Sequence, residues 1–321
     1  MNNYNFDWSD LAFGSKKPLS ELKATFITAP REISTARFTE LIKDYLPTGH
    51  IILGIAKEQY IDGFADQPQF RALKQSDIQP LVDKVNASAS PRKITILRYF
   101  QRDLVSIVEK IKPKRAIFIN GSWHYSFHTL PIYYALTGLS IPYSLVSPFT
   151  DEAEAKSYEK SIEKAIKQPQ QKVFSSDEQV MILVDSVAKS SFDYGFQTGL
   201  VLARKTKTGY KYIASAYNRV VPYQTYAMHF GASRELNFSP PNDLNHYDTI
   251  HAEMELIVKA QKENIDLKGT TLFINLMPCP TCARSLCTTD IDEYVYANDH
   301  SNGYAAALFQ KCGKKVKRII Q

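Results

Sequence analysis

The most informative part of the sequence is His251-Ala252-Glu253 followed, after a helical and a strand-like segment, by Pro278-Cys279-Pro280-Thr281-Cys282. The two cysteines are three residues apart, so on a helix they share one face. With His251 they offer one imidazole nitrogen and two thiolates, a good Zn²⁺ set that leaves the fourth tetrahedral position open for water. Glu253 is close enough to take a proton from that water and pass it to a leaving amine. We therefore predict a zinc site with these three ligands and Glu253 as the catalytic acid–base group.

A lone C-x-x-C spacing also occurs in redox pairs and in structural zinc sites. A redox pair would leave His251 and Glu253 unexplained. A structural site would need a fourth ligand, and the other two cysteines lack a second C-x-x-C spacing. Cys287 could still be that ligand if it lay one turn further along the same helix face. Because catalytic zinc sites keep an open position, we favour catalytic zinc.

The order H-x-E followed by P-C-x-x-C is the signature of zinc-dependent nucleobase deaminases. Residues 173–321 resemble the cytidine and deoxycytidylate deaminase superfamily. The resemblance implies an α/β/α sandwich around a five-stranded mixed sheet, with the zinc between two helix N-termini. The partial positive charge there favours thiolate over thiol.

Three features resemble the deoxycytidylate branch of that superfamily. Ala216-Tyr217-Asn218 resembles its G-Y-N, where the Asn contacts the nucleotide sugar, although an Asn after a strand is also a common turn residue. The motif from Cys279 through Ala283-Arg284 resembles C-x-x-C-A-[KR], and the segment 219–250 has about the length of that branch's insert. Within the insert Arg219 and Arg234 are candidates for the substrate phosphate, because a guanidinium matches phosphate with two hydrogen bonds. Each could equally be a surface arginine. The remaining candidate substrate contacts are Ala252 and Pro278.

Glu255 departs from the family pattern, since many members have an Asn there. The departure at Glu255 bears on the identity of the substrate more than on the type of reaction. We expect hydrolytic deamination of a cytosine nucleotide, preferably dCMP to dUMP and ammonia, with Glu253 as proton shuttle. The alternatives are a deaminase acting on dCTP, another free nucleotide or a base in tRNA, and a non-enzymatic nucleotide-binding regulatory protein with a structural zinc.

Length, charge and cysteine content limit the domain number, the compartment and the partners that we expect. A chain of 321 residues suffices for two domains. The net charge of +6 is modest, and its basic run at 311–318 is more typical of a solvated surface than of a nucleic-acid contact. No apolar run is long enough to span a membrane, and four cysteines without a secretory signal fit a cytoplasmic protein. We expect a small-molecule nucleotide as partner and a homo-oligomer, with neither membrane nor nucleic acid involved.

Residues 1–172 read as a separate domain, Rossmann-like and of unknown role. After an irregular lead-in at 1–20, apolar runs alternate with helical patterns, which predicts a parallel sheet covered on both faces. Neither the G-x-x-x-x-G-K-[ST] nor the G-x-G-x-x-G phosphate fingerprint is present. His124 and His128 have a spacing that could hold a metal on a helix, although such pairs are more often packing or surface residues. The expected strands are 24–29, 50–56, 93–99, 115–119 and 141–146, and the expected helices are 32–45, 77–85, 103–111, 130–136 and 151–167.

A polar linker at 167–172 leads to the deaminase-like domain, 173–321. Its order of elements is helix–strand–strand–helix–strand–helix–strand–helix–strand, as the superfamily would show. The expected strands are 198–203, 211–216, 271–276, 293–297 and 316–320. The expected helices are 178–189, a helix that carries Glu253 and runs to about 262, a helix that Pro278 opens, and 305–311.

Overall fold

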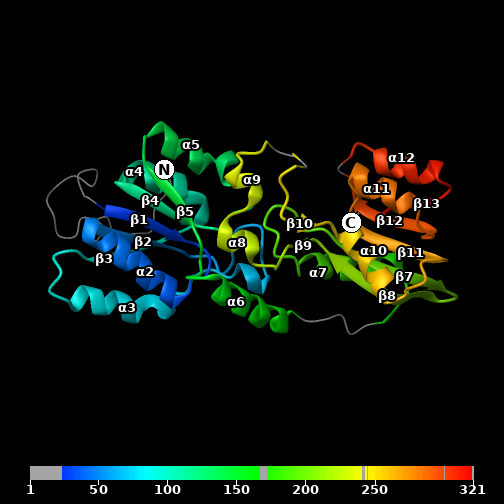
Figure 1. Cartoon of the computed structure of the whole chain (residues 1–321), viewed down its shortest axis with the longest axis horizontal. Coiled ribbons are helices and arrows are strands. Elements are labelled where there is room, and N and C mark those ends of the chain that lie inside the picture. Colours follow the sequence, from blue (N-terminus) through cyan, green and yellow to red (C-terminus); the bar gives the residue numbers. More distant parts are fainter. Residues whose placement is uncertain (1–23, 167–171, 241–242, 244, 300, 320–321) are drawn as a thin grey trace. The chain divides into compact units, whose positions relative to one another are not determined.

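A computed structural model of the chain describes residues 24–166, 172–240, 243, 245–299 and 301–319 (Figure 1). The expected lead-in and nearly all of the expected linker lie outside the described residues. The chain forms two compact units. The N-terminal unit comprises the chain up to Glu163 together with Thr225–Tyr247, and the C-terminal unit comprises Lys164–Gln224 and the chain from Asp248 onward.

The N-terminal unit is built on a five-stranded sheet in the order β3-β2-β1-β4-β5. All four neighbouring pairs are parallel. Each strand coincides with one of the predicted apolar runs to within two residues, because a strand covered on both faces needs apolar side chains throughout. The strands are β1 (Ala24–Ala29), β2 (His50–Ala56), β3 (Ile94–Tyr99), β4 (Arg115–Ile119) and β5 (Tyr143–Val146).

Helices cover both faces of this sheet (Figure 1). Successive residues of a strand point to opposite faces, so Phe26 joins the core under α4 and α5, whereas Ile27 joins the core under α2 and α3. The helices are α2 (Thr35–Tyr45), α3 (Gln75–Ala87), α4 (Leu104–Ile111), α5 (Pro131–Gly138) and α6 (Glu152–Ala165). Short 3₁₀ turns are η2 (Leu46–Thr48), η3 (Pro68–Phe70), η4 (Gln101–Asp103) and η5 (Phe127–Thr129).

The segment Thr225–Tyr247 belongs to the N-terminal unit, although the sequence-based division placed it in residues 173–321. It carries two short helices, α8 (Tyr226–Phe230) and α9 (Ser233–Leu236). The buried carboxylate of Glu235 accepts a hydrogen bond from Nε1 of Trp123. The fully buried guanidinium of Arg31 donates to Sδ of Met228 at 3.0 Å. These contacts make the segment part of the N-terminal core.

The C-terminal unit is an α/β structure around a mixed sheet in the order β13-β12-β11-β7-β8-β6. The expected number of strands was five, and the structure has six. The additional strand, β6, is a two-residue edge strand in which Val173 pairs with Lys211. The pairs among β6, β8, β7 and β11 are antiparallel, and β11, β12 and β13 are parallel. The strands are β6 (Val173–Phe174), β7 (Gly199–Thr206), β8 (Gly209–Tyr217), β11 (Thr270–Leu276), β12 (Glu293–Asn298) and β13 (Lys315–Arg318).

Two apolar layers flank this sheet. Val180 and Val184 of α7 pack against one face, and the other three helices pack against the opposite face. The helices are α7 (Asp177–Ala188), α10 (Ala252–Lys262), α11 (Pro280–Cys287) and α12 (Tyr304–Lys311). A separate ribbon of β9 (Arg219–Val220) and β10 (Thr249–Ile250) joins the two chain segments that flank Thr225–Tyr247. Within the described residues, no helix has the length and apolar character needed to cross a membrane.

Candidate metal centre and active site

Two helix starts in the C-terminal unit carry the predicted zinc ligands. His251 is the N-cap of α10 and follows β10 directly. Cys279 is the N-cap of α11, and its Sγ accepts a hydrogen bond from the backbone N–H of Cys282. Pro280 occupies the first helical position, where its missing N–H would have no intrahelical acceptor. The partial positive charge of both helix starts is therefore directed toward the same group of donor atoms.

The three donor atoms have a separation that fits a tetrahedral metal. Nδ1 of His251 lies 3.6 Å from Sγ of Cys279 and 3.5 Å from Sγ of Cys282. All three atoms are within 4.8 Å of one another, so they could hold a metal ion. Zinc bonds of about 2.1 Å to nitrogen and 2.3 Å to sulfur place neighbouring tetrahedral donors about 3.5–3.8 Å apart. One nitrogen and two sulfurs are also the donor chemistry that zinc prefers, so the residues present fit the ion.

Glu253 lies in the first turn of α10 and is 3% exposed. Burial raises the pKa of its carboxyl to about 7. The two thiols interact closely, and the hydrogen bond from Cys282 holds the pKa of Cys279 well below its usual range. A buried carboxyl and a thiolate thus lie together beside the imidazole.

Asn218, a predicted sugar contact, is a buried link between three segments. Its Oδ1 accepts a hydrogen bond from the backbone N–H of Ala252 at 3.0 Å, which caps the start of α10. Its Nδ2 donates to the carbonyl of Phe196 at 3.2 Å, and its own carbonyl accepts from the hydroxyl of Ser191 at 2.6 Å. The His251 side of the site therefore depends on the amide of Asn218.

The loop between α7 and β7 contributes residues that the sequence analysis missed. One carboxylate oxygen of Asp193 accepts from the N–H groups of Gly195 and Phe196, and the other accepts from the hydroxyl of Thr249 beside His251. Burial raises the pKa of this carboxyl. The Asp-x-Gly order is a signal for this turn, but the bond to Thr249 spans 56 residues and has no local signal.

The two arginines predicted to bind phosphate belong to different units. Arg219 in β9 forms an ion pair with Glu255 of α10, with Nε and Oε1 3.2 Å apart. The unusual Glu255 thus has a local partner. Arg234 lies in the N-terminal unit, where it donates to the carbonyl of Asp243 at 2.8 Å and stacks over the ring of Tyr247 at 4.2 Å.

The other candidates have varied surroundings. Ala252 is fully buried and its backbone N–H donates to Asn218, and Pro278 is buried just before α11. Cys287, the alternative fourth ligand, lies at the end of α11 and interacts with Cys312. Among the described residues, the only candidate metal group of at least three His, Cys, Asp or Glu side chains is the His251–Cys279–Cys282 group. His128 instead makes a hydrogen bond to the carbonyl of Ser239, and His124 stacks on Tyr125.

Comparisons with known proteins point to the same region. Residues 174–298 match the family described as the cytidine and deoxycytidylate deaminase zinc-binding region. ComE operon protein 2 of Bacillus subtilis is 32% identical over 72 residues, which are 22% of this chain and 38% of that protein. The deoxycytidylate deaminase of Enterobacteria phage T2 is 33% identical over 51 residues, which are 16% of this chain and 27% of that protein.

Among solved structures, the dCMP deaminase of cyanophage S-TIM5 in complex with dCMP and dUMP is 18% identical, with a TM-score of 0.33. The match covers 44% of this chain and 95% of that one. The chain spans well under half the length of the two curated relatives. The family match nevertheless includes all three donors and Glu253, so the similarity to the cytidine and deoxycytidylate deaminase zinc-binding region covers the whole candidate site.

Proposed function

We propose that the protein is a zinc-dependent hydrolase that deaminates a cytosine nucleotide, with dCMP as substrate and dUMP and ammonia as products. The observation that carries this proposal is the buried Glu253 beside a group of three donors at two helix starts. In this proposal His251, Cys279 and Cys282 hold the zinc. When bound, zinc supplies a Lewis acid that lowers the pKa of a water molecule toward neutrality.

Glu253 would carry the proton in this reaction. It is not needed as a ligand, so its carboxylate can accept a first proton from the attacking water and deliver it to N3 of the base. It can then take the second proton from the hydroxyl that has added to C4 and deliver it to the departing amino group, which leaves as ammonia. Its burial excludes bulk water, which would otherwise compete for that proton. The N–H groups at the starts of α10 and α11 favour the negative charge that develops there.

The choice of dCMP is supported by the family match and by the similarity to the phage T2 deoxycytidylate deaminase. Arg219 remains our candidate for the phosphate, with Glu255 as its partner when no phosphate is bound. Ala252, Pro278 and the remaining hydrogen-bonding capacity of Asn218 stay proposed substrate contacts, whereas Arg234 belongs to the N-terminal unit and is not carried into this proposal.

The N-terminal unit is proposed to be a Rossmann-like domain. Its support is the parallel strand order β3-β2-β1-β4-β5, the order of doubly wound nucleotide-binding sheets. A cytoplasmic homo-oligomer remains our expectation for the whole protein.

A substrate panel tests the proposed reaction. Ammonia release is measured with deoxycytidine, dCMP, dCTP and tRNA, and we expect dCMP to give the largest kcat/KM. If the protein has a larger kcat/KM for dCTP or for tRNA than for dCMP, that molecule is the substrate and the assignment of dCMP is wrong. Absence of turnover on all four by the zinc-loaded protein would favour a regulatory protein with a structural zinc.

Metal analysis tests the ligand set. Cys279→Ala and Cys282→Ala should each lose the zinc, because two donors hold it far more weakly than three. Cys287→Ala is the matched control on the same helix and should retain about one zinc per chain. Unchanged zinc in both ligand variants would show that the metal is held elsewhere.

A further inference from the structure

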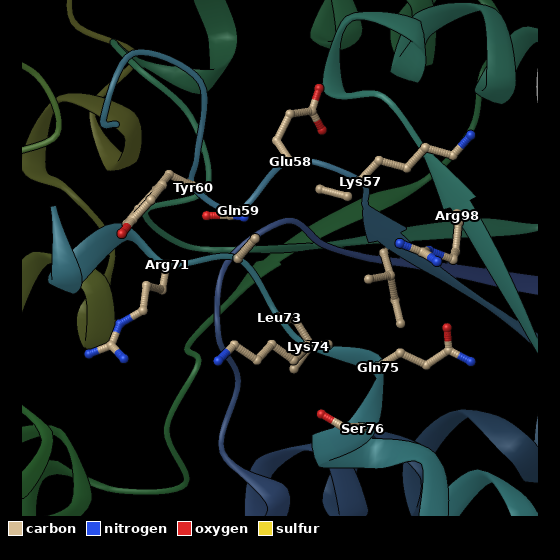
Figure 2. Close-up of a pocket in the computed structure, with 13 residues that line it drawn as sticks. Lys57, Glu58, Gln59, Tyr60, Arg71, Leu73, Lys74, Gln75, Ser76 and Arg98 are labelled. Carbon is tan, nitrogen blue, oxygen red and sulfur yellow. The ribbon is translucent and has the colours of Figure 1, made fainter. Parts of the chain in front are cut away.

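The N-terminal unit contains a pocket of about 630 Å³ that the proposed deamination does not use (Figure 2). The loop after β2, the start of α3 and a residue of β3 form its walls. The volume is within the range of small-molecule sites. The pocket lies at the carboxyl ends of β2 and β3, the edge at which open parallel sheets bind ligands.

The pocket has a strong excess of positive charge. Its charged side chains are four cations and one carboxylate, namely Lys57, Arg71, Lys74, Arg98 and Glu58. The carboxylate of Glu58 accepts hydrogen bonds from the backbone N–H of Gln101 at 3.1 and 3.3 Å. Arg71, Lys74 and Arg98 take part in none of the ion pairs found in the described part of the chain. The protein itself therefore leaves most of this charge uncompensated.

The start of α3 adds to this preference for an anion. Its N-cap is Lys74, which makes no side-chain cap, and Gln75 and Ser76 line the pocket. The first N–H groups of a helix lack intrahelical acceptors and attract anions. Asp77 follows in the first turn and accepts a hydrogen bond from Ser76, but it does not line the pocket.

We propose that this pocket binds the polyphosphate group of a small molecule. Figure 2 shows Arg98 on one side of the pocket and Lys74 at the start of α3 below it. Side-chain cations of this kind replace the glycine-rich loop that the sequence lacks. Four cations against one carboxylate suit a ligand with several negative charges better than a single phosphate. A nucleoside triphosphate and a free polyphosphate share this chemistry.

The test measures binding to the full-length, zinc-loaded protein by calorimetry in saturating dUMP, the proposed product, which occupies the proposed substrate site without being turned over. The probes are ATP, tripolyphosphate, inorganic phosphate and adenosine. We expect ATP to bind much more tightly than adenosine and inorganic phosphate. If tripolyphosphate binds as tightly as ATP, the pocket recognises the polyphosphate alone, and free polyphosphate is the ligand. If tripolyphosphate binds more weakly than ATP, the nucleoside also contributes, and a nucleotide is the ligand.

Matched variants locate the binding. Arg98→Gln and Lys74→Gln should each weaken binding by about tenfold or more, because each removes a charge-assisted hydrogen bond. The controls are Arg115→Gln, at the opposite end of the sheet, and Lys84→Gln, at the opposite end of α3, and both should bind as the unmodified protein does. The proposal is overturned if no probe binds, if adenosine or inorganic phosphate binds as tightly as ATP, or if the control variants lose as much affinity as the pocket variants. Because binding is read directly, this outcome is independent of whether the protein deaminates dCMP.

Discussion

Glu253 and Glu255 are two acidic residues in the first turn of α10 with different surroundings. Glu253 is buried beside the donor group, whereas Glu255 is paired with Arg219. We predict that Glu253→Gln keeps its zinc but loses turnover by about 10²-fold or more, since the proton carrier is removed and no ligand is. Glu255→Gln is the matched control and should lose much less. Both are checked by metal content and ammonia release, and equal losses in the two variants would contradict the role given to Glu253.

The residues of the site were predictable where the signal is local. The proximity of His251, Cys279 and Cys282 was predictable from their spacing, because two helix starts bring their donor atoms within 4.8 Å of one another. Their role as zinc ligands and the role of Glu253 as the acid–base group stay predictions. Asp193 could not be found in this way, since its bond to Thr249 forms only when distant segments meet. For the same reason, the sequence could not reveal that the amide of Asn218 caps α10.

A prediction about α10 as an element follows from that cap. Asn218→Ala removes the acceptor for the N–H of Ala252, so the free energy of unfolding should fall by about 0.5–2 kcal/mol. Because His251 lies at the same helix start, zinc should also be lost to a chelator more readily. Denaturant unfolding and chelator competition measure the two effects. Gln261→Ala, at an exposed position near the end of α10, is the control, and a similar change in that variant would contradict the capping role.

The edge strand β13 is tied to the start of α7 by an ion pair between Lys317 and Asp177. Burial would raise the pKa of Asp177, but hydrogen bonds from Lys317 and Tyr210 outweigh it and lower that pKa below its ordinary value. A carboxyl with a lowered folded-state pKa contributes stability above its unfolded pKa, and this stability is lost as the pH falls through the folded value. Lys317→Met should therefore lower the free energy of unfolding near pH 7, by at most about 1 kcal/mol because solvent screens the half-exposed lysine.

The free energy of unfolding of the unmodified protein and of Lys317→Met is measured with denaturant at a series of pH values, from pH 7 down to below the folded pKa of Asp177. The difference between them should narrow as the pH falls through the folded pKa of Asp177. A difference that is constant with pH would show that Lys317 contributes through packing and not through the ion pair.

Most elements were predictable because each carries its own apolar pattern. The three central strands of the N-terminal sheet, β1, β2 and β4, are buried on both faces, so each is a nearly continuous apolar run bounded by polar residues. The edge strand β6 has only two residues, Val173 and Phe174, which is too short for any periodicity. It pairs with β8, the outer strand of the β7–β8 hairpin, and nothing local to its two residues announces that partner.

The path of the whole chain was the least predictable feature. The chain leaves the C-terminal unit after Gln224 and returns at Asp248, and the segment between belongs to the N-terminal unit. Nothing in its local pattern distinguishes a deaminase insert from a part of another core. The assignment depends on long-range contacts such as those of Met228 with Arg31 and of Glu235 with Trp123.

This path predicts how a separated C-terminal unit behaves. A fragment starting at residue 172 would expose side chains of Thr225–Tyr247 that the N-terminal unit buries, Met228 among them. Exposed apolar surface of this kind promotes aggregation. The ribbon of β9 and β10 holds the two flanking segments together, with the N–H of Val221 bonded to the carbonyl of Asp248 at 2.9 Å, so a short Gly-Ser linker can replace the segment.

We expect the fragment with the linker to be soluble and to bind zinc, and the fragment with the native segment to aggregate. Light scattering and metal analysis of the two fragments at equal concentration measure the difference. If both fragments are equally soluble, the segment does not depend on the N-terminal unit for its burial. If the linker fragment fails to bind zinc, the C-terminal unit needs the segment for its own fold, because the three donors and the cap from Asn218 are all retained in that fragment.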